Sequence, residues 1–358
     1  MRTVTYAQAI NEAQEIALTR DPSVFVIGEG VPDAKGIFGT TIGLAQKFPG
    51  RVMDMPVAEN GMTGICVGAA ISGMRPIMVH ARMDFTLMSF DAIVNTAAKW
   101  YFMFGQKQSV PLVIRMVVGR GWGPGPQHSQ SLQALFAHIP GLKVVMPAVP
   151  ADAKGLLLSA IGDNNPVIFI EHRWLHALTG DVPKGYYEVP IGNARVAKAG
   201  RDVTIVAASY MTIEAMRAAE ALLQEGIAAE VVDLRSIRPL DRNTIVKSVQ
   251  KTHRLIVADT GWKSFGIGAE IVAMVAEAGV HFAMPPVRIA LPDMPTPTSP
   301  ALAGSYYPTG IDILRSALVL CGRKQTVVAR IVKEYAAAIT EVPGFSPDQP
   351  DPTFTGPF

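Results

Sequence analysis

The chain has 358 residues, of which 49% are hydrophobic and 17% charged, and its formal net charge is +2. A chain of this length exceeds one ordinary hydrophobic core, so we expect two domains. The apolar composition excludes disorder over most of the chain. The small net charge, with no long basic run, excludes nucleic acid as the main partner.

Several features of the composition predict a cytoplasmic protein with no membrane partner. The two cysteines, Cys66 and Cys321, cannot form a disulfide framework, which suits a reducing compartment. The first residues, MRTVTYAQAINEAQ, lack the apolar core of a signal peptide. The longest apolar stretch, residues 61–74, is too short to span a bilayer. The 16 Met residues and the positive mean hydropathy indicate large interfaces, and hence an oligomer.

Strand-like apolar runs alternate with segments of helical spacing along the first half of the chain. The first predicted helix covers residues 5–19, where alanines and Ile10 recur at helical spacing. The other predicted helices cover residues 59–74, 89–101, a segment from about 129, and 151–161. The predicted strands are residues 23–30, 51–57, 75–83, 111–118, 142–148 and 166–172. This alternation indicates a parallel sheet covered by helices on both faces.

A polar, turn-rich segment over residues 178–200 interrupts this pattern, which then begins again. The fold class predicted is therefore α/β, with two parallel-sheet domains. The predicted divisions are a first domain over 1–185, a linker over 186–200, a second domain over 201–322 and a tail over 323–358. Within the tail we expect a helix over residues 327–339 and an extended, Pro-rich end over residues 342–358.

Glu59 lies between a predicted strand and an apolar, glycine-rich helix. A carboxylate in such a place is costly unless it has a partner or a chemical role. Gly61, Gly64 and Gly68 share one face of the helix, which would let another backbone approach closely. On spacing alone, Glu59 can be a residue that caps the helix and interacts with its dipole, or a functional carboxylate.

His128 lies in the loop GRGWGPGPQHSQ, which contains four glycines and two prolines. Such a loop can hold a side chain over a site. Because histidine exchanges protons near neutral pH, His128 is a candidate for proton transfer. The alternative is a structural histidine in a turn.

Residues 1–322 resemble the β subunit of the thiamine-diphosphate-dependent E1 component of 2-oxo acid dehydrogenases, a relative of the C-terminal half of transketolase. The resemblance is carried, in the order of the family, by PVAENGMTGICVGAAISGMRPI, FDAIVNTAAK, QHSQSLQALFAHIPGLKVVMPAVPADAKGLLLSAIGDNNPVIFIE, VVDLRSIRPLD, GIGAEI and DMPTPTSP. It implies a transketolase-like pyrimidine-binding domain followed by a transketolase C-terminal domain.

The resemblance also implies catalytic roles for the two residues singled out above. Glu59 matches the glutamate that hydrogen-bonds N1′ of the cofactor aminopyrimidine. An apolar setting raises a carboxyl pKa, which would help Glu59 to share a proton with that ring. His128 matches the QHSQ histidine that lies near the bound 2-oxo acid.

Four further residues match the wall of the cofactor pocket. Phe85 matches the aromatic residue that packs on the aminopyrimidine, with an ordinary core phenylalanine as the alternative. Val57, Ala81 and Met88 match other positions of that wall. Ala81 and Met88 differ from the usual dehydrogenase side chains, which predicts a reshaped pocket.

The resemblance implies metal ions and a partner subunit as well. Asp163 and Asn165 match positions where E1 β chains can hold a monovalent cation such as K⁺, although a helix-capping turn explains them equally. The chain lacks the GDG motif that holds Mg²⁺ on the cofactor diphosphate. We therefore expect an α-type E1 subunit that carries the Mg²⁺ ligands and shares the thiamine diphosphate in an α₂β₂ assembly.

Two functions follow from the resemblance. The first is an E1-type subunit that decarboxylates a 2-oxo acid and transfers the acyl unit to a lipoyl E2. The alternative is a two-component, transketolase-like carboligase that transfers an acyl or ketol unit to an aldehyde or sugar. The polar run at residues 80–84, His176 in place of a common tyrosine, and the tail beyond 322 are departures that put the E2 partner in doubt. A silent scaffold subunit is disfavoured, because Glu59 and His128 are both present.

Overall fold

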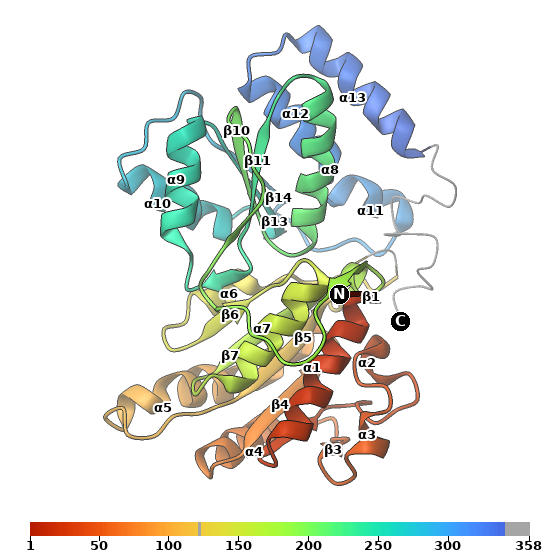
Figure 1. Ribbon diagram of the computed structural model, residues 1–358, viewed down its shortest axis with the longest axis vertical. Coiled ribbons are helices and arrows are strands. Elements are labelled where there is room, and N and C mark those ends of the chain that lie inside the picture. Colours follow the sequence, from red (N-terminus) through yellow and green to blue (C-terminus); the bar gives the residue numbers. More distant parts are fainter. Residues whose placement is uncertain (121–122, 341–358) are drawn as a thin grey trace. The chain divides into compact units, whose positions relative to one another are not determined.

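The computed structural model describes residues 1–120 and 123–340, which form two compact units (Figure 1). One unit holds Met1–Arg120 and Gln127–Ile191, and the other holds residues 123–126 and 192–340 of the described chain. The Pro-rich end predicted over residues 342–358 lies outside the described residues. In the part of the chain that is described, no helix is both long and apolar enough to cross a membrane.

The elements of the first unit follow one another in the order β1 (Arg2–Thr5), α1 (Tyr6–Arg20), β2 (Val24–Ile27), α2 (Gly36–Gly39), α3 (Leu44–Lys47), β3 (Val52–Met53), α4 (Glu59–Ile71), β4 (Arg75–His80), η1 (Met83–Ser89), η2 (Ala92–Ala97), α5 (Ala98–Met103), β5 (Val113–Val118), α6 (Gln133–Ala137), β6 (Lys143–Val145), α7 (Pro150–Gly162), β7 (Val167–His172), η3 (Arg173–Leu175) and β8 (Thr179–Val182).

The second unit contains β9 (Arg195–Lys198), β10 (Val203–Ala207), α8 (Tyr210–Gln224), β11 (Ala229–Asp233), β12 (Ser236–Arg238), α9 (Arg242–Thr252), β13 (Leu255–Trp262), α10 (Ile267–Glu277), β14 (Val287–Leu291), α11 (Pro300–Tyr306), α12 (Gly310–Leu320) and α13 (Gln325–Thr340).

The core of the first unit is a parallel sheet whose strands lie in the order β6-β7-β5-β4-β2-β3. Strands β2, β5 and β7 are buried along their whole length, as the continuous apolar runs predict for a sheet covered on both faces. Because the strands are parallel, their carboxyl ends lie at one edge. From β2 the chain goes to β3 on one side, whereas β4 pairs with β2 on the other side. The boundary between β2 and β4 is therefore a switch point in the order of the strands. Ligands of parallel sheets bind at such switch points.

Local interactions that the sequence pattern did not reveal fix the start of the chain. Thr5 and Gln8 form a capping box at the start of α1, which packs against α7. Strand β1 pairs antiparallel with β8, with Thr5 opposite Thr179. Neither strand has the apolar run that would have predicted it.

Two predicted helices of the first unit were wrong in type or in boundary. The segment predicted as one helix over 89–101 begins at the last residue of the 3₁₀ segment η1 and continues as the π-helical η2 and the short α5. The helix predicted from about residue 129 begins only at Gln133. In the preceding residues the Ser131 hydroxyl donates to Gln133 Oε1 over 2.7 Å, a local bond that competes with a helical start.

The second unit has a sheet of its own in the order β14-β13-β10-β11-β9. All its pairings are parallel except that of the edge strand β9 with β11. Helices α8 and α12 cover one face, and α9 and α10 lie on the other (Figure 1). The sequence pattern missed α12, although Thr309 and Asp312 form a capping box at its start.

Helix α13 is part of the core of the second unit. Val328 and Ile331 are buried with residues of α8 and α12, and Tyr335 packs at the edge of that cluster. The tail that the sequence predicted therefore includes a helix whose apolar face is covered by its own chain.

The burial of α13 predicts that it stabilises the second unit. Ile331→Ala should lower the free energy of unfolding by about 3 kcal/mol, since it removes buried methyl and methylene groups and leaves a cavity. Lys333→Ala, at an exposed position of the same helix, is the matched control and should change it by less than about 0.5 kcal/mol. Urea titrations of both variants make the comparison. Equal stabilities would mean that α13 does not contribute to folding.

Candidate active site

The carboxyl edge of the first sheet collects the chemically interesting residues of this unit. Glu29, Ala81 and Arg173 follow β2, β4 and β7 respectively. The end of β2 approaches the end of β4 so closely that a Cβ atom on Gly28 would lie 2.3 Å from the carbonyl oxygen of Val79. Only glycine fits there, so the sequence brings these two strand ends together at the switch point.

Glu59 is the first residue of α4 and is half-buried. Its side chain makes no hydrogen bond to the described residues, and the preceding Ala58 supplies no side-chain cap. An acidic group in the first turn still interacts favourably with the helix dipole. The helix dipole therefore favours the interpretation of Glu59 as a helix-capping residue, but Glu59 makes no capping hydrogen bond.

The charges of two other carboxyl groups, those of Asp54 and Glu59, act on Glu29 here. Burial, followed by the charges of Glu59 and Asp54, raises the pKa of Glu29. Glu29 Oε1 is buried and has no hydrogen-bond partner among the described residues. Asp54 is held in place, because its Oδ1 atom accepts from the amides of Gly30 and Met55 at 2.9 Å.

The predicted pocket wall falls on two neighbouring segments. Val57 precedes α4, Ala81 follows β4, and Phe85 and Met88 lie on η1. Segment η1 packs against α4 and β4. Val57 and Met88 are 82% and 66% exposed, unusually high for large apolar side chains. They are available to pack against an apolar ring system.

The loop that carries His128 is anchored at the end of β5. A Cβ atom on Gly119 would lie 2.0 Å from the carbonyl oxygen of His128, so glycine is required at that close approach. The rings of Phe85 and His128 meet edge to face, with centroids 5.4 Å apart. Asp84 accepts from Gln130 Nε2 over 2.8 Å. Burial raises the pKa of Asp84, although its bonds from Gln130 oppose the rise.

The predicted cation position at Asp163 and Asn165 is surrounded by positive side chains. Arg75 Nη1 donates to the carbonyl oxygens of Ile161 and Asp163, both over 3.0 Å, and Lys143 forms an ion pair with the Asp163 carboxylate. The amide of Asn165 donates to Asp163 Oδ1 over 2.9 Å, as in a turn that caps a helix. Within the described residues no group of three or more His, Cys, Asp or Glu side chains could hold a metal ion. The monovalent cation stays a prediction.

The glycine face of α4 is not covered by this chain. A Cβ atom at Gly61, Gly64 or Gly68 would have nothing within 4 Å, and Ile65 between them is 60% exposed. No described part of this chain packs closely on that face, so the close approach predicted from these glycines stays a prediction.

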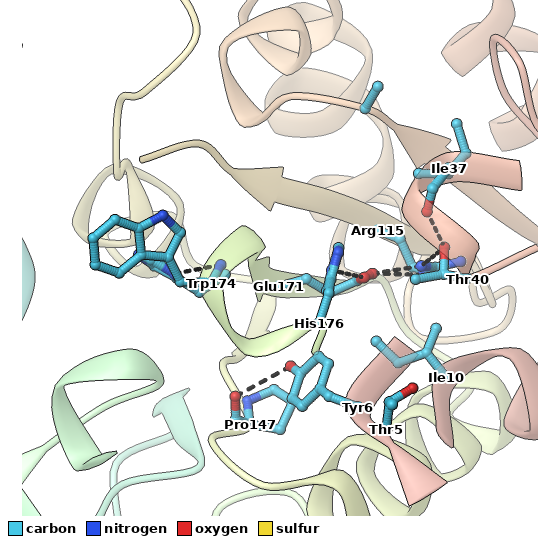
Figure 2. Close-up of polar contacts among 12 residues, drawn as sticks. Thr5, Tyr6, Ile10, Ile37, Thr40, Arg115, Pro147, Glu171, Trp174 and His176 are labelled. Carbon is cyan, nitrogen blue, oxygen red and sulfur yellow. Dashed lines mark hydrogen bonds and ion pairs between the residues drawn. The ribbon is translucent and has the colours of Figure 1, made fainter. Parts of the chain in front are cut away.

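A buried polar network lies under the same edge (Figure 2). Arg115 on β5 forms an ion pair with Glu171 on β7 over 2.7 Å, and both side chains are fully buried. The same guanidinium donates to Gln14 Oε1 over 2.8 Å and to Thr40 Oγ1 over 2.9 Å. His176 Nε2 lies 3.2 Å from the other Glu171 oxygen. Burial alone would raise the pKa of Glu171, but Arg115 and His176 outweigh it and lower that pKa.

Buried histidines are the other titratable groups of this region. Burial lowers the pKa of His80 to about 4 and that of His172 well below its usual value of 6.5. Burial also lowers the pKa of His176, although its bond to Glu171 opposes the fall. All of them are therefore held neutral near neutral pH.

Sequence reasoning missed several residues at this edge. Glu29, Phe38 and Arg173 were not singled out, and Arg82 and Asp84 were noted only as part of a polar run. Arg173 follows directly on β7, and Glu29 and Arg82 each lie two residues beyond the end of a strand. Polar residues placed immediately after parallel strands were the available signal.

The fold defines an α/β protein whose first unit is a parallel sheet with a switch point between β2 and β4. The sequence matches two family models, the transketolase pyrimidine-binding domain over residues 2–177 and the transketolase C-terminal domain over residues 192–313. The chain therefore belongs to the transketolase-like family, which confirms both the resemblance and the predicted fold class.

Several of its relatives are β subunits. The acetoin:2,6-dichlorophenolindophenol oxidoreductase subunit beta of Cupriavidus necator is 44% identical over 333 residues, covering 88% of this chain and 97% of that protein. The pyruvate dehydrogenase E1 component subunit beta of Rickettsia conorii is 40% identical over 320 residues, covering 89% and 98%. A solved split-gene transketolase, an inactive β4 tetramer, superposes with a TM-score of 0.72 at 24% identity, covering 90% of this chain and 99% of that chain. That last similarity concerns the fold alone.

The neutral histidines predict how stability depends on pH. The unfolded chain binds protons on these residues below their usual pKa of 6.5, so the free energy of unfolding should fall as pH drops from there towards 4. When the pH falls from about 7 to about 5, the free energy of unfolding should decrease in both proteins. The decrease should be about 2 kcal/mol smaller in His80→Gln than in the unchanged protein.

Urea titrations across this pH range measure the effect. His138→Gln, at an exposed position on the same unit, is the control and should keep the slope of the unchanged protein. If the two variants had the same slope, His80 would not be a buried neutral group.

Proposed function

We propose that the chain is the β subunit of a heteromeric thiamine-diphosphate enzyme of the E1 type, which decarboxylates a 2-oxo acid and transfers the resulting acyl unit. The observation that carries this proposal is the arrangement at the switch point. Glu59 begins α4 near the half-buried Glu29, and the Phe85–His128 pair lies on neighbouring segments. The names of the relatives, β subunits of acetoin and pyruvate dehydrogenases, favour this function over the carboligase alternative.

The residues present suit the pyrimidine half of thiamine diphosphate. Glu59 would bind the ring nitrogen, and Val57, Ala81, Phe85 and Met88 would contact the ring. The orphaned Glu29 oxygen supports this fit, since a carboxyl group beside Glu59 can help to retain a shared proton there. When bound, thiamine diphosphate supplies a thiazolium carbon that accepts the negative charge left by loss of CO₂.

Two side chains of this chain divide the proton chemistry. The Glu59 carboxyl group would share a proton with the pyrimidine nitrogen when the ring is bound. His128, held at the end of β5 by the Gly119 approach, orients the 2-oxo acid and exchanges a proton with it. Asp84 and Gln130 fix the loop that follows the histidine.

The proposal includes an assembly. Relatives named subunit beta imply an α-type partner, which we place in an α₂β₂ enzyme with most of the Mg²⁺ ligands on the α subunit. A K⁺ ion near Asp163 and Asn165 belongs to the same proposal. We do not include a lipoyl E2 in this assembly, since the tail beyond residue 322 departs from the family resemblance. The free cysteines, Cys66 and Cys321, support a cytoplasmic location.

The function is tested by co-expressing the chain with its α-type partner. The complex should release CO₂ from one of a panel of 2-oxo acids and reduce 2,6-dichlorophenolindophenol, both only with thiamine diphosphate and Mg²⁺. Ketol transfer to an aldehyde without dye reduction would support the carboligase instead. No cofactor-dependent release of CO₂ from any 2-oxo acid would contradict the proposal.

Substituting Glu59 and His128 separates cofactor activation from substrate handling. Glu59→Gln keeps the shape but loses the shared proton, so exchange of the cofactor C2 proton in the complex should slow by about 100-fold or more. His128→Ala should leave that exchange nearly unchanged and reduce turnover by about 100-fold.

Exchange is followed by NMR after transfer into D₂O, and turnover by dye reduction. Exchange near the normal rate in Glu59→Gln would leave Glu59 as a helix-capping residue. Equal slowing of exchange in both variants would contradict the assignment of His128 to the substrate.

A further inference from the structure

His80 is a buried histidine that has no part in the chemistry proposed above. It is the last residue of β4, and it begins the polar run at residues 80–84 that departs from the family resemblance. Its side chain is only 2% exposed, and its Nε2 atom is buried with no hydrogen-bond partner in the described chain. The great majority of buried polar groups in proteins have such a partner. An unpaired imidazole nitrogen therefore indicates a further group that binds it.

The face of the sheet on which His80 lies follows from its neighbours on β4. Side chains alternate between the two faces of a strand, so His80 and Met78 share one face. The sulfur atom of Met78 lies 3.1 Å from the hydroxyl oxygen of Thr63 on α4. The imidazole of His80 is therefore on the face of the sheet that α4 covers.

His80 also lies level with the first turn of α4. From Met78 to His80 the strand advances by about 6.6 Å towards the carboxyl edge of the sheet. From Thr63 back to Glu59 the helix covers about 6 Å in the same direction, because a helix that connects parallel strands runs antiparallel to them. The Thr63 hydroxyl donates to the Glu59 carbonyl oxygen over 2.7 Å, which fixes this turn. His80 and Glu59 are therefore neighbours at the start of α4.

Glu29 reaches the same place from the adjacent strand. Strand β2 pairs parallel with β4, and the continuation of that register places Glu29 opposite His80. The two chains stay close beyond the paired residues, because a Cβ atom on Gly28 would lie 2.3 Å from the carbonyl oxygen of Val79. Neighbouring strands are about 4.8 Å apart, so the side chains of Glu29 and His80 start from adjacent points.

Glu29 carries the second unpaired atom of this place. Its Oε1 atom is buried and has no hydrogen-bond partner among the described residues. Burial, and after it the charge of Glu59, raises the pKa of Glu29, so the two carboxyl groups lie near each other. Two unpaired polar atoms on adjacent strands suit one bound water, which donates to the carboxyl oxygen and shares a second hydrogen bond with the imidazole nitrogen.

The chemistry of a buried histidine favours hydrogen bonding over packing as the role of His80. Burial lowers the pKa of His80 to about 4, so near neutral pH its ring is uncharged and has one donor and one acceptor nitrogen. Burying either nitrogen without a partner costs free energy. A phenylalanine of nearly the same shape would fill the position without that cost.

We infer that His80 is a positioning residue of the candidate active site, which holds the Glu29 carboxyl group through one buried water and so fixes Glu29 beside Glu59. The role in the reaction rests on the proposed function, whereas the link between His80 and Glu29 does not. A fixed Glu29 keeps the surroundings of Glu59 constant while Glu59 shares its proton with the bound ring. Loss of the link therefore slows activation of the cofactor and leaves its binding unchanged.

NMR of the full chain, with its histidines labelled with ¹⁵N, tests the link without cofactor or partner. The ring nitrogen resonances of His80 are assigned by their loss in His80→Gln. Glu29→Gln should shift them, because the water that the two residues share changes its hydrogen bonds. Glu15→Gln is the matched control and should leave them unchanged, since Glu15 is also half-buried but pairs with Lys47 over 2.8 Å. Equal His80 resonances in the unchanged protein and both glutamate variants would overturn the link.

Exchange of the cofactor C2 proton, in the complex with the α-type subunit, tests the role. His80→Phe keeps the shape and loses the hydrogen bonds, so exchange should slow by about tenfold, the effect of one hydrogen bond, while thiamine diphosphate affinity stays within about twofold. His80→Gln keeps a donor and an acceptor, so its rate should stay within about threefold of the unchanged rate. Met78→Leu, on the same face of β4, is the control for packing and should exchange at the unchanged rate.

The pattern of rates decides between hydrogen bonding and shape. Exchange at the unchanged rate in His80→Phe would overturn the role, and so would equal slowing in His80→Phe and His80→Gln. Should His80→Phe fail to fold, His80→Leu takes its place in the same comparison. A complex without cofactor-dependent turnover, in which Glu29→Gln still shifts the His80 resonances, would overturn the proposed function and leave the link standing.

Discussion

The ion pair between Arg115 and Glu171 is the interaction on which the carboxyl edge depends. Removing two charges from water is so costly that such a pair persists only when its remaining hydrogen-bonding groups are satisfied. Here Gln14, Thr40 and His176 supply those bonds. The pair therefore does more than join two strands, because its partners come from α1, from the turn after α2 and from the chain after β7. Breaking it would release all of these segments together.

From this pair the order extends outward to the surface in a chain of contacts. Thr40 is bonded to Arg115 and holds the Ile37–Phe38 turn in a conformation that those residues would not adopt alone. Phe38 then orders two arginines whose charges repel each other. Strain and repulsion of this kind are retained where the rest of the fold overdetermines them, and such places are typical of ligand sites. The buried network thus also orders the stacking of Arg82 and Arg173 on Phe38.

The sequence predicted the fold class because parallel strands buried on both faces leave an unmistakable pattern of apolar runs and amphipathic helices. It did not predict the 3₁₀ and π segments between Met83 and Ala97, since their apolar spacing resembles that of an ordinary helix. Glu59 and His128 were singled out through their motifs, and their catalytic roles stay predictions. The stacking of Arg82 and Arg173 on Phe38 could not be found, because the contact depends on the order of strands in the sheet and no local pattern records it.

The exposed apolar surfaces of the first unit suggest a reason why the candidate active site would need a partner subunit. Val57 and Met88 leave most of their apolar surface open, and the glycine face of α4 with Ile65 has no neighbour in the described chain. A carboxylate that shares a proton with a ring works best away from water, yet Glu59 is only half-buried here. Exclusion of water by a second subunit would supply what this chain lacks. Assembly, on this argument, is itself a step in making Glu59 competent.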